Sequence, residues 1–445
     1  MTSTIPKGFH ALPLSVAQLS LAAVLKCGQS FRWSILPLPE RKTVAEDDND
    51  KLLTHEYRLC LRDRVVCLQQ TSSTLFYRSY FSDAAPTPIE EAKREAETLV
   101  WLKDYFQLDV DLEKLYKEWA LKDAVFTKFQ DRFKGIRILR QDPWENLISF
   151  ICSSNNNITR ISKMVQNLCK HFSPPLLSLP DPCNPEEMAT YHPFPSPSVL
   201  AASEVNATLR SLGFGYRAEY IQRTAKMLVD AHGAEPLTSG YREPSEIWLE
   251  TLRKVDTAAA REELMKFVGV GRKVADCVLL MSMDKSEVVP VDTHVYQIAV
   301  KHYGLKGSSG KATMTPKLYD DVNGKMQSLW GDYAGWAYSV TCPPPSLSSE
   351  LTLATRFVQV LFTADLKIFS NYGLEATAST SPSKTPLASP TKALQKLAID
   401  DRPDVLTSPL PVPSPSPLKR KAERAPSDAI DQTPRLTRRR TRGGT

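Results

Sequence analysis

The sequence has no apolar run near the ~18 residues that a membrane-spanning helix needs, so no transmembrane segment is expected. Residues 1–10 lack the apolar core of a secretory signal and the Arg-rich character of a transit peptide. The 8 cysteines are scattered and include no C-x-x-C pair, which argues against a disulfide framework or a zinc ribbon. Together these absences favour an intracellular protein with reduced thiols and no membrane partner.

Most of the chain carries no net charge. Residues 371–445 carry 13 Lys and Arg against 7 Asp and Glu, a surplus that accounts for the whole formal net charge of +6. The first 370 residues are therefore neutral overall, and any surface that binds a polyanion must be a local basic patch. The same tail holds 11 prolines and a single aromatic, Tyr372, so it cannot bury a core and is predicted to be disordered.

Two basic clusters in the tail, Lys419 to Lys421 and Arg435 to Arg442, are typical of nuclear-localisation signals. A nonspecific DNA-binding tail explains them nearly as well, and the two roles are compatible. Nuclear localisation is expected, and a mitochondrial pool stays an open alternative.

The first part of the chain, residues 8–95, is rich in β-formers. Gln29 to Ile35 and Tyr57 to Gln69 have the composition of strands, and Leu75 to Phe81 is a short aromatic segment. From about residue 96 the apolar residues recur at helical spacing instead. An order of strands first and helices later predicts an α+β fold.

The start of one helix can be placed closely. Asp142-Pro143-Trp144-Glu145 supplies an N-cap carboxylate, a proline at the first helical position and a glutamate at the third. This helix should stop at the run Asn155 to Asn157, and a second helix should resume at Ile158. The Pro-rich residues 173–197 are predicted to be a connecting loop.

A Gly-x-Gly motif, Gly269 to Gly271, opens a helix that carries Lys273 in its first turn. Backbone N–H groups of such a hairpin can bind a phosphate without reading sequence. The helix dipole and partial burial both favour the neutral, nucleophilic form of a lysine at this place. Asp292, further along, could stabilise a cationic transition state. A solvated lysine and an aspartate that only caps a helix are the alternative interpretations.

Six motifs in chain order resemble the eukaryotic 8-oxoguanine DNA glycosylase/AP lyases of the helix-hairpin-helix superfamily. They are Cys27 to Trp33, Cys152 to Ile158, Gly213 to Arg217, Phe267 to Cys277, Pro290 to His294, and Gly335 to Ala337 with Leu361 to Leu366. The resemblance implies an N-terminal antiparallel sheet domain, residues 8–120, packed on a two-part helical body, residues 121–370. The helix-hairpin-helix would span about 257–283, and the tail would begin at 371.

The resemblance also implies roles for single residues. Lys273 would attack C1′ of the damaged nucleotide, displace the base and form a Schiff base, and elimination of the 3′ phosphate would follow. Asp292 would stabilise the charge on the sugar. The damaged base would contact Gly28, Cys277, Pro290, Asp292, Tyr338 and Phe362. The DNA around it would contact Asn155, Arg160, Tyr216, Arg217, Gly269, Gly271 and His294.

The role of Gly28 rests on hydrogen-bond chemistry. Oxidation at C8 turns N7 of guanine from an acceptor into an N–H donor, which a backbone carbonyl can accept. Against ordinary guanine the same buried carbonyl would stay unpaired, at a cost of roughly 1–3 kcal/mol. A glycosylase for a different lesion and a DNA-binding module without activity are the competing functions. The Gly28 motif argues against the first, and the pair Lys273 and Asp292 argues against the second.

The expected partner is double-stranded DNA containing 8-oxoguanine opposite cytosine, and the protein is expected to be a monomer. Cys60 and Cys67 have the spacing of the first two ligands of a glycosylase iron–sulfur cluster, but no third or fourth cysteine follows suitably. No cofactor is therefore expected, apart from a monovalent cation that carbonyls of the hairpin could hold.

The chain departs from the family pattern at residues 340–359, which include Pro343 to Pro345. A translated short intron and a genuine surface loop both explain this insertion, and the intron is preferred. Its removal would join Ser339 to Val360 and would place Tyr338 where the family usually has a glutamine that contacts the base. Gln359 is the competing residue if the insertion is part of the protein.

Overall fold

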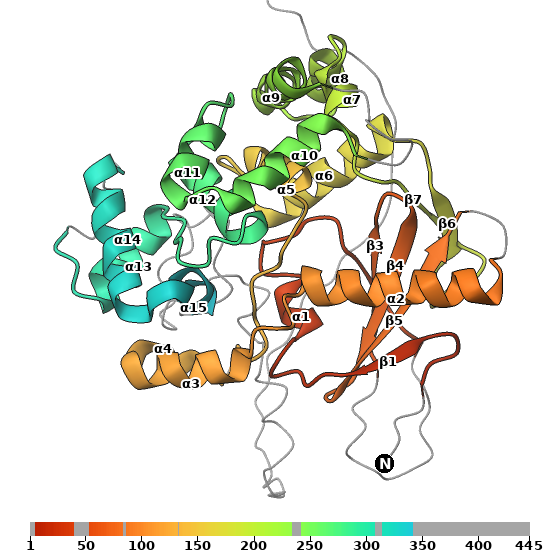
Figure 1. Cartoon of the computed structure of the whole chain (residues 1–445), viewed down its shortest axis with the longest axis horizontal. Coiled ribbons are helices and arrows are strands. Elements are labelled where there is room, and N and C mark those ends of the chain that lie inside the picture. The colour runs from red at the N-terminus through yellow and green to blue at the C-terminus, as the bar shows by residue number, and fades with distance from the viewer. Residues whose placement is uncertain are drawn as a thin grey trace, which may run out of the picture. The chain divides into compact units, whose positions relative to one another are not determined.

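A computed structural model describes residues 5–39, 53–82, 86–131, 133–233, 242–307 and 314–340. Figure 1 shows an N-terminal sheet and a larger helical body, which confirms the predicted α+β class. Phe362, residues 341–359 of the insertion and the tail 371–445 lie outside these ranges. Within them no helix is long and apolar enough to span a membrane.

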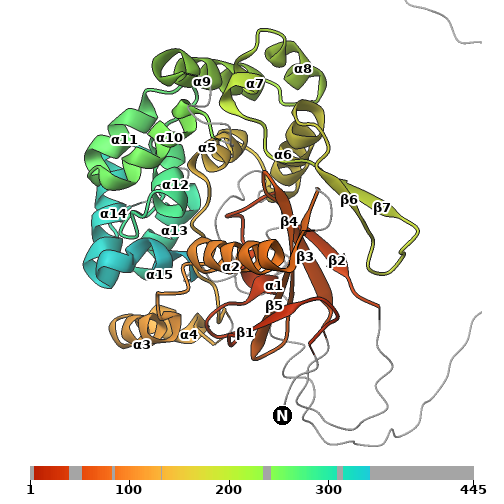
Figure 2. The ribbon, with the colours of Figure 1, turned by 45° about the vertical axis from the view of Figure 1, so that its right-hand side comes forward.

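The sheet has five antiparallel strands in the order β1-β5-β4-β3-β2. The strands are β1 (His10–Pro13), β2 (Ser34–Pro37), β3 (His55–Cys60), β4 (Arg64–Gln70) and β5 (Thr74–Phe81). Successive side chains of a strand point to opposite faces. One face, with Leu59, Val66 and Leu68, shares a core with Leu102 of helix α2 (Pro88–Tyr105), which lies across the sheet in Figures 1 and 2.

The opposite face of the sheet packs against a hairpin that the sequence did not predict. Strands β6 (Leu177–Pro180) and β7 (Met188–Tyr191) lie within the segment expected to be a loop, so that expectation was wrong. Leu179 and Tyr191 pack with Cys60, Val65 and Cys67 of the sheet. The hairpin is stable because a second surface covers its apolar side, and no local pattern reveals that surface.

The predicted strand from Gln29 to Ile35 is also wrong in its first half, because only β2 from Ser34 onward is a strand. The Gln29 side chain makes hydrogen bonds to the backbone of a distant segment, of the kind that strand pairing would otherwise supply. Its Nε2 donates to the Arg137 carbonyl at 3.0 Å, and its Oε1 accepts from the Leu139 N–H at 3.0 Å. The run from Tyr57 to Gln69 forms β3 and β4 with a turn between them, and the aromatic segment Leu75 to Phe81 lies in β5.

The helical elements of the described chain comprise α1 (Leu21–Val24), α3 (Leu112–Lys122), α4 (Ala124–Phe129), α5 (Pro143–Cys152), α6 (Ile158–Phe172), α7 (Pro197–Ala201), α8 (Val205–Ser211), α9 (Arg217–His232), α10 (Pro244–Thr251), α11 (Thr257–Met265), α12 (Arg272–Ser282), α13 (Thr293–His302), α14 (Pro316–Trp330) and α15 (Ala334–Val340), with short 3-10 turns at Leu252–Lys254 and Gly331–Tyr333. The predicted start of α5 is confirmed, since Asp142 Oδ1 accepts from the Glu145 N–H at 3.0 Å. The predicted stop at the asparagine run is confirmed as well.

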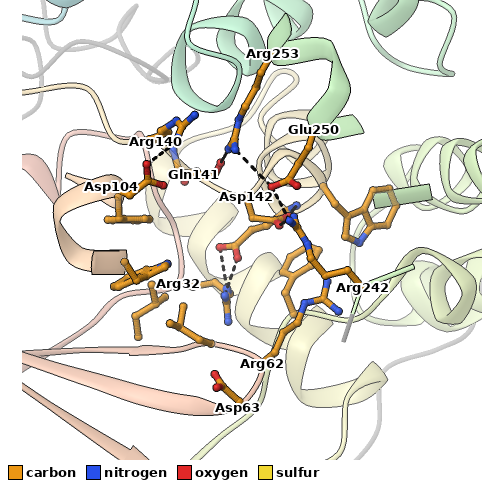
Figure 3. A pocket seen from close by; sticks show the side chains of 17 residues that line it. Arg32, Arg62, Asp63, Asp104, Arg140, Gln141, Asp142, Arg242, Glu250 and Arg253 are labelled. Carbon is orange, nitrogen blue, oxygen red and sulfur yellow. Dashed lines mark hydrogen bonds and ion pairs between the residues drawn. The ribbon is translucent and has the colours of Figure 1, made fainter. Parts of the chain in front are cut away.

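Ion pairs join the sheet to the helical body around a cavity of about 410 Å³ (Figure 3). Arg32 donates to both carboxylate oxygens of Glu145 on α5, at 2.8 and 2.6 Å, and to the Cys60 carbonyl at 2.7 Å. On the helical side of the cavity, Arg242 pairs with two different carboxylates, Asp142 at the start of α5 and Glu250 on α10. None of the predicted site residues lines this cavity. The bonds from Arg32 to Glu145 hold the loop that contains Gly28 against α5.

Candidate active site

The hairpin between α11 and α12 contains the two glycines singled out in the sequence, and they serve different needs. Gly269 has φ +82°, and a Cβ there would lie 2.4 Å from Cδ2 of Tyr220 on α9. Gly271 is exposed and extended, with φ −90°, and nothing lies within 4 Å of a Cβ placed on it. The fold itself therefore requires glycine at 269, whereas at 271 a side chain would meet open space.

We expect Gly269→Ala to lower the free energy of unfolding strongly. Gly271→Ala should lower it only slightly but should weaken binding to DNA. A left-handed alanine against a packed ring should cost about 2–4 kcal/mol. Alanine as a poorer N-cap should cost about 0.5–1 kcal/mol, yet its methyl group would lie where a phosphate must approach. Urea unfolding and binding to undamaged duplex measure the two effects. Equal loss of stability in both variants would contradict this distinction.

Lys273 lies in the first turn of α12, and its side chain is half-buried. Its Nζ lies 5.3 Å from the centroid of the Phe150 ring on α5, within range of a cation–π contact. The sequence reasoning missed Phe150, because a buried aromatic at helical spacing indicates only a core position. The ring bounds the amine on one side and limits the directions in which it can point.

Cys277 lies one turn after Lys273 and is fully buried. Burial raises the pKa of the Cys277 thiol to about 12, the ammonium of Lys273 opposes this shift by its charge and by a hydrogen bond, and the charges of Asp276 and Asp292 add to it. Lys273 and Cys277, four residues apart, share one face of α12.

Asp292 caps helix α13, as expected. Its Oδ1 accepts from the Val295 N–H at 3.1 Å, which fixes the direction of the carboxylate. Pro290, two residues earlier, is buried. The backbone of His294 lies in the first turn of α13, but its side chain is outside the described part of the chain, so the predicted phosphate contact stays a prediction.

Two further residues predicted to contact the damaged base, Gly28 and Tyr338, lie in the described part of the chain. Gly28 is buried with φ +86°, and three residues later the Phe31 ring lies 5.8 Å from that of Phe150. Tyr338 on α15 is 5% exposed and belongs to the helical core. Helix α15 itself lies against the segment that leads to Asp292, since the Gly335 N–H donates to the Ser286 carbonyl at 2.9 Å.

Four of the side chains predicted to contact the DNA around the damaged base form a second group, namely Asn155, Arg160, Tyr216 and Arg217. Tyr216 Oη donates to the Ser154 carbonyl at 3.1 Å, and Arg217 donates to the same carbonyl and, at 3.0 Å, to that of Asn155. Asn155 is exposed and left-handed, with φ +46°. Arg160 is exposed and donates to the Gly213 carbonyl at 3.1 Å. Arg217 is 3% exposed and holds the asparagine turn in this structure.

Tyr220 connects this second group to the hairpin. Its ring packs edge-on against Tyr216 at 5.4 Å and lies directly beneath Gly269. The hairpin is held to the same helix by Thr224, whose hydroxyl donates to the Val268 carbonyl at 3.0 Å. The asparagine turn follows the end of α5, the helix that also carries Phe150. A continuous series of contacts thus runs from the asparagine turn to Lys273.

Comparison with known proteins agrees with this arrangement. The N-terminal domain family of 8-oxoguanine DNA glycosylases matches residues 11–147, and the HhH-GPD superfamily of base excision DNA repair proteins matches residues 148–319. The N-glycosylase/DNA lyase of Saccharomyces cerevisiae is 34% identical over 348 residues, which cover 75% of this chain and 85% of the yeast protein. The chain belongs to the 8-oxoguanine DNA glycosylase family.

Other members of the 8-oxoguanine DNA glycosylase family are similar over the same region. The N-glycosylase/DNA lyase OGG1 of Arabidopsis thaliana is 35% identical, over 80% of this chain and 84% of its own. The 8-oxoguanine glycosylase/lyase of Clostridium acetobutylicum, solved with double-stranded DNA containing cytosine opposite 8-oxoG, superposes with a TM-score of 0.54 at 26% identity, covering 76% of this chain and 94% of its own. As a member, the chain is a bifunctional N-glycosylase and DNA lyase.

The described residues contain no group of three or more His, Cys, Asp or Glu side chains that could hold a metal ion. For the monovalent cation expected at the hairpin, the donors would be carbonyl oxygens. The Phe267 carbonyl already accepts from the Val270 N–H at 3.2 Å, and the Val268 carbonyl from Thr224. Each retains one lone pair, so the hairpin suits a weakly held cation and the cation stays a prediction.

Proposed function

We propose that this glycosylase removes 8-oxoguanine from duplex DNA where it lies opposite cytosine, and that Lys273 is its nucleophile. The observation that supports the proposal is the position of Lys273, which lies in the first turn of α12 directly after the Gly269 to Gly271 hairpin, with its Nζ 5.3 Å from the centroid of the Phe150 ring. The DNA complex of the C. acetobutylicum enzyme supports the same substrate.

In the proposed reaction Nζ of Lys273 forms a bond to C1′ while the bond from C1′ to the base breaks. The base leaves with that electron pair and takes up a proton that the attacking amine loses. The bond from C1′ to the ring oxygen then breaks to give a protonated imine between C1′ and Nζ, and the ring oxygen takes up a proton from solvent. Loss of a C2′ proton places its electron pair between C2′ and C3′ and expels the 3′ phosphate. Positive charge builds on the sugar as the base departs, and the carboxylate of Asp292 would stabilise it. This carboxylate caps α13, so its direction is fixed before the reaction begins.

Recognition of the base would rest on Gly28, Cys277, Pro290 and one or both of Tyr338 and Phe362. A flipped base costs a few kcal/mol of lost stacking and pairing. Asn155, Arg160, Tyr216 and Arg217 would offset this cost by filling the vacated stack and pairing with the orphaned cytosine. Arg217 would have to exchange its bonds to the asparagine turn for bonds to the cytosine. We propose that the enzyme needs no iron–sulfur cluster and acts as a monomer.

Borohydride trapping tests the proposal. The purified chain is incubated with duplexes that carry 8-oxoguanine opposite each of the four bases, and with duplexes that carry other oxidised or alkylated bases. We expect a reduced covalent protein–DNA complex with 8-oxoguanine, strongest opposite cytosine, and strand cleavage without borohydride. Trapping with another lesion but not with 8-oxoguanine would contradict the substrate, and absence of any trapping would contradict the lysine mechanism.

A further inference from the structure

Three polar side chains of α14 face the segment that leads to Asp292. Tyr319, Asn323 and Gln327 are spaced four residues apart, so they lie along one face of the helix. Asn323 Nδ2 donates to the Val289 carbonyl at 3.0 Å, and Gln327 Nε2 donates to the Glu287 carbonyl at 3.1 Å. Tyr319 Oη accepts from the Val291 N–H at 3.0 Å. Three successive turns of α14 therefore bind Val291, Val289 and Glu287, every second residue of the segment 287–291.

Tyr319 also reaches the helix that carries Lys273. Its hydroxyl donates to Asp276 Oδ2 at 2.6 Å, and Asp276 Oδ1 accepts from Arg261 Nε on α11 at 2.6 Å. Asp276 is fully buried and lies three residues after Lys273. The guanidinium of Arg272, the residue before Lys273, lies 4.3 Å from the centroid of the Tyr319 ring. One tyrosine thus contacts both the nucleophile's helix and the residue before Asp292.

The other side of the segment is closed as well. A Cβ on Gly335 of α15 would lie 2.3 Å from the Val288 carbonyl oxygen, so the backbones approach each other closely there. Tyr319 is 3% exposed, and burial raises the pKa of its hydroxyl well above the ordinary value, with the charge of Asp276 adding to the effect. The hydroxyl therefore stays protonated and can donate to Asp276 at any physiological pH.

We propose that Tyr319, Asn323 and Gln327 are positioning residues for the glycosylase reaction, which set the register of residues 287–292 and so the distance between Asp292 and Lys273. The inference rests on the proposed function of these two residues. A slip of the segment by one residue would break all three hydrogen bonds and would carry Asp292 away from the amine. A misplacement of about 1 Å can slow a reaction about 100-fold without weakening binding.

Tyr319→Phe tests the proposal, because it removes the hydroxyl and leaves the ring beneath Arg272. Single-turnover excision from an 8-oxoguanine:cytosine duplex gives the maximal rate and the protein concentration at half-maximal rate. We expect the maximal rate to fall at least tenfold and the half-maximal concentration to change less than twofold. Hydrogen exchange of the Val291 amide in the free protein should accelerate.

Tyr303→Phe is the matched control. Tyr303 Oη donates to Asp123 Oδ2 at 2.9 Å, a tyrosine–aspartate hydrogen bond in the same helical body whose carboxylate lies between α3 and α4. Tyr303→Phe should lose less thermal stability than Tyr319→Phe, because the Trp330 indole still donates to Asp123 Oδ2 at 3.2 Å, and it should keep its maximal rate within twofold. Equal loss of rate in both variants, or an unchanged rate in Tyr319→Phe, would overturn the proposal.

Two further measurements separate the possible failures. Gln327→Met removes one donor at a half-buried position and keeps the side-chain length, so it provides the test if Tyr319→Phe does not fold. It should lower the maximal rate without a change in half-maximal concentration. If the unsubstituted protein shows no excision, the proposed function fails. Faster Val291 exchange in Tyr319→Phe would then still show that the hydroxyl holds the segment, whereas unchanged exchange would refute the register itself.

Discussion

Lys273→Gln is expected to abolish both base excision and borohydride trapping while damaged duplex still binds. The amide has no basic lone pair to form a bond with C1′, and loss of a nucleophile lowers a rate on the order of 10³-fold or more. Binding should persist because the hairpin and the residues around the asparagine turn are unchanged. Stability should fall by only about 1–2 kcal/mol, the value of a partly desolvated cation–π contact such as that with the buried Phe150 ring. Gel-resolved trapping and single-turnover excision measure the loss.

Lys266→Gln is the control for this variant. Lys266 lies at the end of α11, seven residues before Lys273, and pairs on the surface with Glu263 at 2.7 Å. Its loss should leave trapping at the level of the unsubstituted protein. Undiminished trapping in Lys273→Gln would show that another amine forms the covalent bond.

Asp292→Asn is expected to slow excision on the order of 10²-fold or more and to change stability little. Asparagine caps helices about as well as aspartate, so the bond from the Val295 N–H should survive. The substitution removes the negative charge that, in the proposed reaction, stabilises the sugar as the base departs. Single-turnover rates and thermal unfolding of the same preparation measure the two effects.

Asp256→Asn provides the matched control for the cap. Asp256 Oδ1 accepts from the N–H groups of Ala258 and Ala259 at the start of α11. This substitution should change stability about as much as Asp292→Asn and should leave excision unchanged. A large loss of stability in Asp292→Asn with near-normal excision per folded molecule would mean that the carboxylate only caps its helix.

Local chemistry predicted the parts of the fold that depend on near neighbours. The start of α5 follows from Asp142 and Pro143, and the start of α6 from Asn157, whose side chain accepts from the Arg160 N–H at 2.9 Å. The hairpin β6–β7 and the irregular path of Gln29 to Trp33 could not be predicted in this way. The hairpin depends on a sheet surface more than a hundred residues away in the sequence, and the segment from Gln29 depends on a long-range side-chain hydrogen bond.

The candidate site shows the same division. The motifs located Lys273 and Asp292, because hairpins and caps leave local patterns. Tyr319 was missed, although the four-residue spacing of Tyr319, Asn323 and Gln327 was visible in the sequence. That spacing defines a polar face of a helix but does not say what the face contacts. The extended segment that it binds became identifiable only when the structure placed it there.

The two glycines of the hairpin have a consequence for how variants of this protein are classified. A screen that scores cellular abundance would reject alanine at Gly269, where Tyr220 occupies the space, and would pass alanine at Gly271, where nothing does. A screen that scores survival under oxidative stress would reject both. The difference between the two screens, position by position, would separate residues that the fold requires from residues that only the repair activity requires.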